Sequence, residues 1–105
     1  MKNVPDLSQL DGFVWDSANT QKNWDRHKVA FYECEEIFFR NPVILADPEH
    51  SEDEFRFFTM GKSLRERYLT IVFTVRENKI RVISARDMSR KERREYGKIQ
   101  KNSKI

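Results

Sequence analysis

The order of apolar and polar positions predicts a short strand and two helices in the first part of the chain. Residues 13–15 form an apolar run, and Asp16 follows as a helix N-cap whose carboxylate accepts from the free N–H groups of a helix over 17–27. Asn41 and Pro42 end a second helical pattern, because the residue before a proline disfavours the helical conformation. That second helix is predicted from four apolar side chains at helical spacing, namely Phe31, Cys34, Ile37 and Phe38.

Apolar runs of strand length fill the middle of the chain. Turns are predicted at residues 61–63 and at 77–78, which makes the last three strands consecutive antiparallel hairpins. The predicted strands cover residues 43–46, 55–60, 69–75 and 80–85.

A two-residue loop at Glu77-Asn78 would set the register of the last hairpin. Val75 would then face Ile80, and the same regular register would place Arg81 and Arg86 on opposite faces of the sheet.

These elements predict an α+β fold. A last helix is expected to run through Tyr96 and to end at Gly97, since glycine often follows the end of a helix. The fold is then an antiparallel sheet of about four strands, with two N-terminal helices packed on it and a C-terminal helix. One domain is predicted over residues 13–97, between a flexible leader of residues 1–12 and a flexible basic tail of residues 98–105.

Length and charge narrow the class of protein. A chain of 105 residues is long enough for one domain with a modest core. The net charge of +3 is small but unevenly spread: residues 1–75 carry 9 basic and 13 acidic side chains (−4), whereas residues 76–105 carry 11 and 4 (+7). The charge of the last third is therefore compatible with binding a polyanion, such as nucleic acid or a membrane surface.

Cysteine usage and hydropathy predict the compartment. Cys34 is the single cysteine, which excludes an intrachain disulfide framework. No apolar run has the length of a signal peptide or a membrane span. A soluble cytoplasmic protein without a membrane partner is expected.

The chain lacks the residues that several classes of active site need. The 3 glycines form no phosphate-binding loop. His27 and His50 are the only histidines and lie in different predicted elements, which argues against a zinc site. No serine stands in a nucleophile motif. We expect no metal and no cofactor.

An imidazole and a carboxylate, followed along the chain by cations, are the parts of a metal-free ribonuclease. RNA cleavage needs a base for the 2′-OH proton, a proton donor for the leaving 5′ oxygen, and fixed cations around the phosphorane. Glu54 or His50 would be the base and the other the acid or an orienting group, while the guanidinium groups of the arginines clamp the phosphate. The candidate catalytic residues are His50, Glu54, Arg56, Arg81 and Arg86, and the candidate phosphate-binding residues are Lys62, Arg67 and Arg76.

The same residues also admit plainer interpretations. His50, Ser51 and Glu54 are common residues of a polar loop, and strand arginines often only form ion pairs at the edge of a sheet. The chain would then be a non-catalytic nucleic-acid-binding module whose arginines hold backbone phosphates. A third hypothesis is an interaction subunit of a repressor complex.

Ordered motifs along most of the chain resemble the BrnT family of bacterial type II toxins. The opening matches F-x-W-D at Phe13, Trp15 and Asp16. Later stretches match D-x-x-H-S-x-x-E-x-R, G-x-S, R-x-I-S-A-R and E-R-x-x-Y in the same order. The matching residues after the opening are Asn23, His27, Val29, Phe31, Glu35, Glu36, Phe38, Phe39, Asn41, Pro42, Asp47, His50, Ser51, Glu54, Arg56, Gly61, Ser63, Arg67, Arg81, Ile83, Ser84, Ala85, Arg86, Glu92, Arg93 and Tyr96.

The resemblance implies a RelE-like fold and a ribonuclease that stops translation. It also implies a BrnA-like antitoxin with a ribbon-helix-helix DNA-binding domain, which covers the toxin and represses the operon of the pair together with it. Operator DNA is then contacted through the antitoxin. RNA, free or on the ribosome, becomes the expected polyanion for this chain.

Overall fold

The structure, a computed structural model, describes residues 5–40, 42–47 and 54–102. Within that part of the chain, no helix has the length and apolar character needed to cross a membrane. The elements in chain order are a 3-10 helix η1 (Leu7–Gln9), strand β1 (Gly12–Val14), helices α1 (Ser17–His27) and α2 (Phe31–Phe38), strands β2 (Val43–Asp47), β3 (Arg56–Lys62), β4 (Tyr68–Arg76) and β5 (Lys79–Asp87), and helix α3 (Arg90–Asn102).

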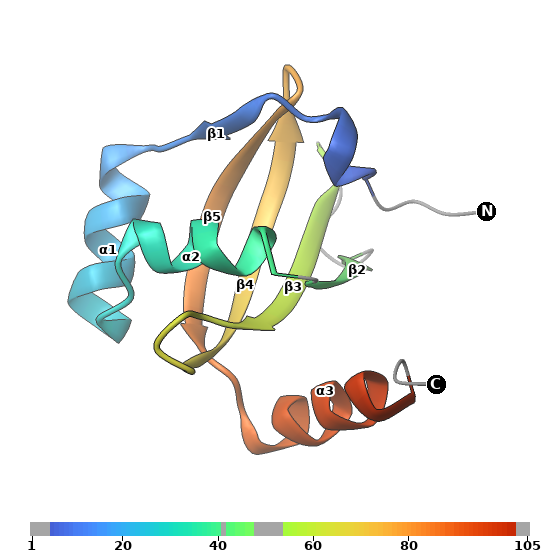
Figure 1. Cartoon of the computed structure of the whole chain (residues 1–105). Helices are drawn as coiled ribbons and strands as arrows, with labels where there is room; N and C mark the ends of the chain where they lie inside the picture. The colour runs from blue at the N-terminus through green and yellow to red at the C-terminus, as the bar shows by residue number, and fades with distance from the viewer. Residues whose placement is uncertain (1–4, 41, 48–53, 103–105) are drawn as a thin grey trace.

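The strands form one mixed sheet in the order β1-β5-β4-β3-β2 (Figure 1). Strands β2 to β5 pair antiparallel with their neighbours, as predicted. Strand β1 adds a fifth strand, parallel to β5, so the prediction of about four antiparallel strands was incomplete. The three residues of β1 pair with residues 79–81 of β5. A short apolar run in the sequence does not indicate which strand it will pair with.

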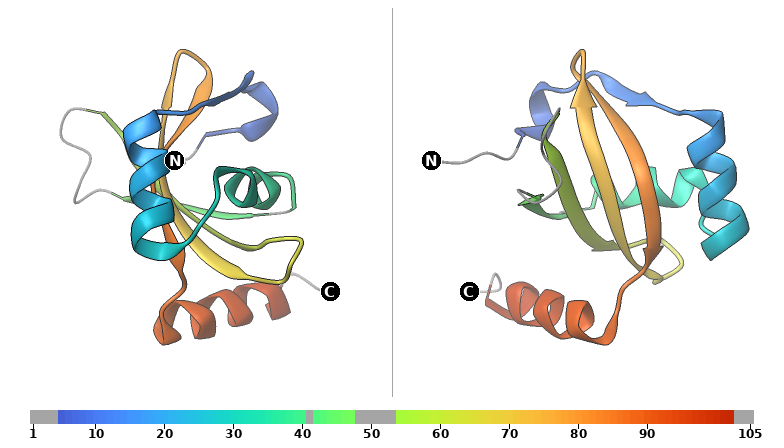
Figure 2. Two further views of the ribbon diagram at one scale, coloured as in Figure 1. Left: turned by 90° about the vertical axis from the view of Figure 1, so that its left-hand side faces the viewer. Right: turned by 180° about the vertical axis from the view of Figure 1, so that it is seen from behind.

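The core lies between the sheet and α2, which crosses one face (Figures 1 and 2). Leu69, Ile71 and Phe73 of β4 are fully buried on this helix face. Gly61 lets α2 approach, because a Cβ there would lie 2.6 Å from Cγ2 of Ile37. Gly61 is a residue of β3, so the prediction of a turn at 61–63 was wrong. The chain turns over residues 63–67 instead.

We call the opposite face of the sheet the open face. Helix α3 lies at one end of the strands and contacts this face only there (Figure 2). The positions of the open face follow from the strand register, because paired residues share a face and alternate residues change face. They are Arg56, Phe58, Met60 and Lys62 of β3, Tyr68, Thr70, Val72, Thr74 and Arg76 of β4, and Lys79, Arg81, Ser84 and Arg86 of β5.

Helix α1 covers the edge of β5 that β1 does not reach. It starts as predicted, with Asp16 accepting from the backbone N–H groups of Ala18 and Asn19. Its buried Asn23 accepts the backbone N–H of Ala85 at 3.2 Å. A helix side chain thus accepts a backbone N–H at the edge of the strand that would otherwise be an unpaired donor.

Both ends of the chain contribute to the fold more than the sequence suggested. Helix α3 continues through Gly97 to Asn102, so the prediction that Gly97 ends it was wrong. Glycine is tolerated inside a helix at a cost of about 1 kcal/mol relative to alanine. Leu7 and Leu10 pack against the core, although they fall in the predicted leader. The division of the chain into leader, domain and tail stays a prediction.

Strand β5 contains a β-bulge. Phe73 pairs with Val82, and the next residue, Val72, pairs with Ser84, which leaves Ile83 as an extra residue on β5. A bulge of this kind turns over every side chain that follows it relative to a regular ladder.

The bulge places two arginines on one face. Thr74 pairs with Arg81 and Thr70 pairs with Arg86. Thr70 and Thr74 are four residues apart on one strand and therefore share a face. Arg81 and Arg86 accordingly both belong to the open face, and the prediction that they lie on opposite faces was wrong because it assumed a regular register.

Candidate functional site

Two arginines flank a threonine in one row across the open face. Arg56 pairs with Thr74, and Thr74 pairs with Arg81. The two arginine Cα atoms are two strand spacings apart, about 10 Å. Thr74 is 1% exposed, and its hydroxyl donates to the backbone carbonyl of Phe55 at 2.8 Å. A ligand that approaches this row therefore meets guanidinium groups.

A second row adds two cations and a carboxylate beside the first. Arg76 pairs with Lys79 across the turn of the last hairpin. Glu54 accepts two hydrogen bonds from the Arg76 guanidinium, at 2.9 and 3.3 Å. Sequence reasoning missed Lys79, although its place opposite Arg76 follows from the predicted two-residue turn. We call these residues the basic cluster: Glu54, Arg56, Arg76, Lys79 and Arg81.

Asp16 ties Arg81 to the start of α1. Its Oδ2 lies 3.5 Å from Nη2 of Arg81, while its Oδ1 caps the helix. The backbone N–H groups of Asn19 and Ala18 lower the pKa of Asp16, and the charge of Arg81 adds to this effect. The residue identified in the sequence as a helix cap thus also positions an arginine of the cluster.

Arg86 lies on the same face but is engaged by α3. Its guanidinium donates to both carboxylate oxygens of Glu92, at 2.8 and 2.9 Å. Glu92 also accepts from the Thr70 hydroxyl and the Ser89 N–H, and these bonds, that of Arg86 foremost, lower its pKa to about 2. Thr70, the residue paired with Arg86, lies four positions along β4 from Thr74, a distance of about 13 Å. The structure therefore does not bring Arg86 to the basic cluster.

Arg67 uses all five of its N–H groups within the protein. They donate to the backbone carbonyls of His27 and Lys28 and to the carboxylates of Glu33 and Asp87. The hydrogen bond to Asp87 raises the pKa of Arg67 and lowers the pKa of Asp87. Arg67 thereby joins the end of α1, the first turn of α2 and the end of β5.

The remaining predicted residues lie elsewhere. Lys62 is six residues from Arg56 on β3, about 20 Å away. His50 lies outside the described residues. Of the eight predicted site residues, the structure brings together Glu54, Arg56, Arg76 and Arg81.

The described residues offer neither a metal site nor a thiol nucleophile. No three His, Cys, Asp or Glu side chains among them come together as metal ligands. Cys34 is buried in the core, and burial raises its pKa to about 12, which keeps the thiol protonated.

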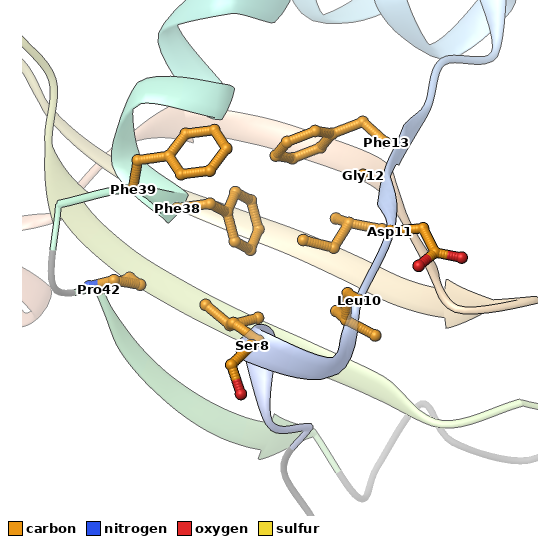
Figure 3. Close-up of a pocket in the computed structure, with 10 residues that line it drawn as sticks. Ser8, Leu10, Asp11, Gly12, Phe13, Phe38, Phe39 and Pro42 are labelled. Atoms are coloured by element: carbon orange, nitrogen blue, oxygen red, sulfur yellow. The ribbon is translucent and has the colours of Figure 1, made fainter.

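An apolar groove of about 570 Å³ lies on the helix face, between α2, β1 and η1 (Figure 3). Phe13, Phe38 and Phe39 line it, and Phe39 is 79% exposed. Asp11 is the one titratable residue among those that line it. The groove therefore lacks an acid-base pair and lies on the side of the sheet away from the basic cluster.

Comparisons with known proteins point to one family. Residues 15–92 match the family model described as the ribonuclease toxin, BrnT, of type II toxin-antitoxin systems. A similar solved structure is the 1.1 Å crystal structure of the Brucella abortus ribonuclease toxin, BrnT, with a TM-score of 0.58 and 18% sequence identity, covering 75% of this chain and 97% of that chain. The similarity supports the α+β fold. A search of curated proteins gave no match.

Proposed function

Because the chain belongs to the BrnT family of ribonuclease toxins of type II toxin-antitoxin systems, we propose that it is a metal-independent endoribonuclease that cleaves RNA and thereby inhibits translation. The observation that carries this proposal is the row in which Arg56 and Arg81 flank Thr74, beside the carboxylate of Glu54. The row lies on a face of the sheet that no described helix covers at that end (Figure 2).

The chemistry follows from where the charges lie. The scissile phosphate sits between the guanidinium groups of Arg56 and Arg81, which match its oxygens in a bidentate manner. One of Glu54 and His50 takes the proton of the 2′-OH, and the 2′ oxygen forms a bond to phosphorus. The bond from phosphorus to the 5′ oxygen breaks as the other residue donates a proton to that oxygen. The products are a 2′,3′-cyclic phosphate and a 5′-OH.

The other arginines take supporting roles. Arg76 orients the Glu54 carboxylate through its two hydrogen bonds. We leave Arg67 out of the phosphate-binding set, because its five N–H groups are already donated within the protein. Arg86 acts by holding α3 against the sheet through Glu92.

The proposed partner is a BrnA-like antitoxin with a ribbon-helix-helix DNA-binding domain. It neutralises the toxin in the cytoplasm, and the complex represses the operon of the pair, with operator DNA contacted through the antitoxin. The substrate is RNA, free or on the ribosome.

The experiment adds purified chain to a translation extract with end-labelled message, with and without EDTA. The wild type is compared with Glu54→Gln, Arg81→Gln and the control Arg65→Gln, which removes a positive charge from the exposed turn between β3 and β4. Discrete cleavage that survives EDTA is expected for the wild type and for Arg65→Gln. Glu54→Gln and Arg81→Gln are each expected to cut at least about 100-fold more slowly.

Three results would contradict the proposal in different ways. Unchanged cutting by Glu54→Gln would remove the acid-base role of this residue. Loss of cutting in EDTA, with recovery on adding Mg²⁺, would remove metal independence. An intact message in every lane, with RNA still bound, would leave a non-catalytic nucleic-acid-binding subunit.

A further inference from the structure

A second basic hollow lies where α3 meets the ends of β3 and β4, away from the basic cluster. Its volume is about 280 Å³. Lys62 of this hollow lies about 20 Å along β3 from Arg56 of the basic cluster. The hollow is lined by Lys62, Tyr68, Arg93, Tyr96, Gly97 and Gln100.

Two cations converge on one aromatic ring in this hollow. The Arg93 guanidinium carbon lies 3.8 Å from the centroid of the Tyr68 ring, and the Lys62 Nζ lies 5.7 Å from it. Both contacts are cation–π interactions, which hold the charges in place without neutralising them. None of the lining residues is a carboxylate, and among the described residues neither Lys62 nor Arg93 forms an ion pair.

The neighbouring groups suit an anion as well. Tyr96 stands edge-to-face against Tyr68. A phenol is protonated at neutral pH, and burial raises the pKa of Tyr96 further, so its hydroxyl is a proton donor. Arg40 lies near enough for its positive charge to oppose that effect. Gln100 adds an amide group to the lining. Positive charges gathered without a carboxylate repel one another, and an anion between them relieves that repulsion.

We propose that this hollow binds a backbone phosphate of single-stranded RNA several nucleotides away from the bond that is cut. Arg93 is exposed, so stacking one face of its guanidinium on Tyr68 leaves N–H groups for two phosphate oxygens. The inference rests on the proposed function, and it adds a specific consequence: affinity depends on RNA length, because only a longer RNA reaches both sites.

The test measures binding of single-stranded 2′-O-methyl RNA by fluorescence anisotropy over a range of salt concentrations. This RNA has no free 2′-OH and stays intact. Arg93→Gln and Lys62→Gln are each expected to weaken binding of a long RNA about tenfold. Each is also expected to make the slope of log K against log salt shallower by about 0.7, the value for one lost phosphate contact on a single strand. The matched control Arg94→Gln, exposed on the same helix, is expected to stay close to the wild type.

Short RNA and duplex DNA provide the further arms of the experiment. An RNA too short to span both sites is expected to bind wild type and Arg93→Gln equally. Equal loss in Arg93→Gln and Arg94→Gln at every length, or no RNA binding by the wild type, would overturn the inference. So would an equal dependence on Arg93 with duplex DNA, which would assign the hollow to DNA. Melting temperatures of the variants confirm that each is folded.

Cleavage of unmodified RNA is recorded separately to keep the two proposals apart. Binding that depends on Arg93 without any cleavage would contradict the proposed ribonuclease and leave the second site standing. Cleavage that depends on Glu54, with binding indifferent to Arg93, would do the reverse.

Discussion

At the scale of single residues, arginines of identical chemistry take different roles because their partners differ. Arg67 is surrounded by two backbone carbonyls and two carboxylates, so its guanidinium N–H groups are hydrogen-bonded within the protein. Arg86 is matched by one carboxylate in a bidentate pair. Arg81 meets Asp16 at 3.5 Å, a longer contact that leaves more of its guanidinium for a phosphate.

Arg67→Ala is expected to lower the free energy of unfolding by about 2–3 kcal/mol. The substitution leaves the buried Glu33 carboxylate without this partner, and an uncompensated buried charge is costly. Urea unfolding measures the change, with Arg65→Ala as a control that is expected to stay within about 0.5 kcal/mol of the wild type. Full stability together with weakened RNA binding would instead restore the phosphate-binding prediction for Arg67.

Glu92 is expected to make stability depend on acid pH. Its folded-state pKa of about 2 lies below its ordinary value of 4.5, so between these values the unfolded chain takes up a proton that the folded chain does not. Its contribution is therefore complete above pH 4.5 and is lost as the pH falls toward 2. Glu92→Gln should be less stable than the wild type at neutral pH and approach it near pH 2. Urea unfolding at several pH values tests this.

Glu95→Gln is the matched control for that series, because it removes an exposed carboxylate from the same helix. It is expected to leave the pH dependence as in the wild type. A gap between Glu92→Gln and the wild type that persists undiminished at low pH would show that the side chain stabilises through its shape rather than its charge.

At the scale of elements, the distance between α2 and the sheet depends on the absence of one side chain. Ile37 of α2 sits where the Cβ of residue 61 would be, so helix and strand approach each other at this glycine. The other helix contact, that of α1, depends on the amide of Asn23 at the edge of β5. The two N-terminal helices therefore attach to the sheet by different means, one by close packing and one by a hydrogen bond.

Gly61→Ala is expected to destabilise the protein by about 1–3 kcal/mol, because its Cβ would lie 2.6 Å from Cγ2 of Ile37. In the background of Ile37→Ala, which removes Cγ2, the same change should cost much less, and a double-mutant cycle measures the coupling. Gly97→Ala is the contrasting control: nothing lies within 4 Å of its Cβ position inside α3, so it should stabilise by about 1 kcal/mol. Additive costs for the first pair would refute the close-approach explanation.

At the scale of the whole molecule, the features that local chemistry determines were predictable. Asp16 caps α1 with its own side chain, and the turn at Glu77 and Asn78 has positive φ at both residues, as a tight hairpin requires. The pairing of Thr74 with Arg81 lies close to that turn and followed from it. The half of the row formed by Thr74 and Arg81 was therefore accessible from the sequence. The place of Arg56 was not, because a turn predicted at residues 61–63 gives β3 and β4 a different register from the observed turn at 63–67.

The features that depend on distant partners were not predictable. The bulge at Ile83 is followed by Ala85, which is buried in the core and donates its N–H to Asn23, 62 positions away in the chain. The hydrogen bonds of Arg67 to the end of α1 and to α2 join it to residues 34 to 40 positions earlier in the chain. Residue type identifies a cation, but the carboxylates and carbonyls around it decide whether it is available to a ligand.

The bulge in β5 also has a consequence for the gene that encodes the chain. Because Ile83 is an extra residue beside Val72, strand β5 can lose one residue and still pair with β4 along its whole length. Deletion of the codon for Ile83 restores a regular pleat and keeps Arg86 opposite Thr70. Insertion of one codon beside it has a different effect. The longer strand must either leave a second residue unpaired or turn Arg86 toward the core. The deletion is expected to retain more of the melting temperature and of RNA cleavage than the insertion. A deletion as damaging as the insertion would show that the bend itself, rather than residue count, is what this strand requires.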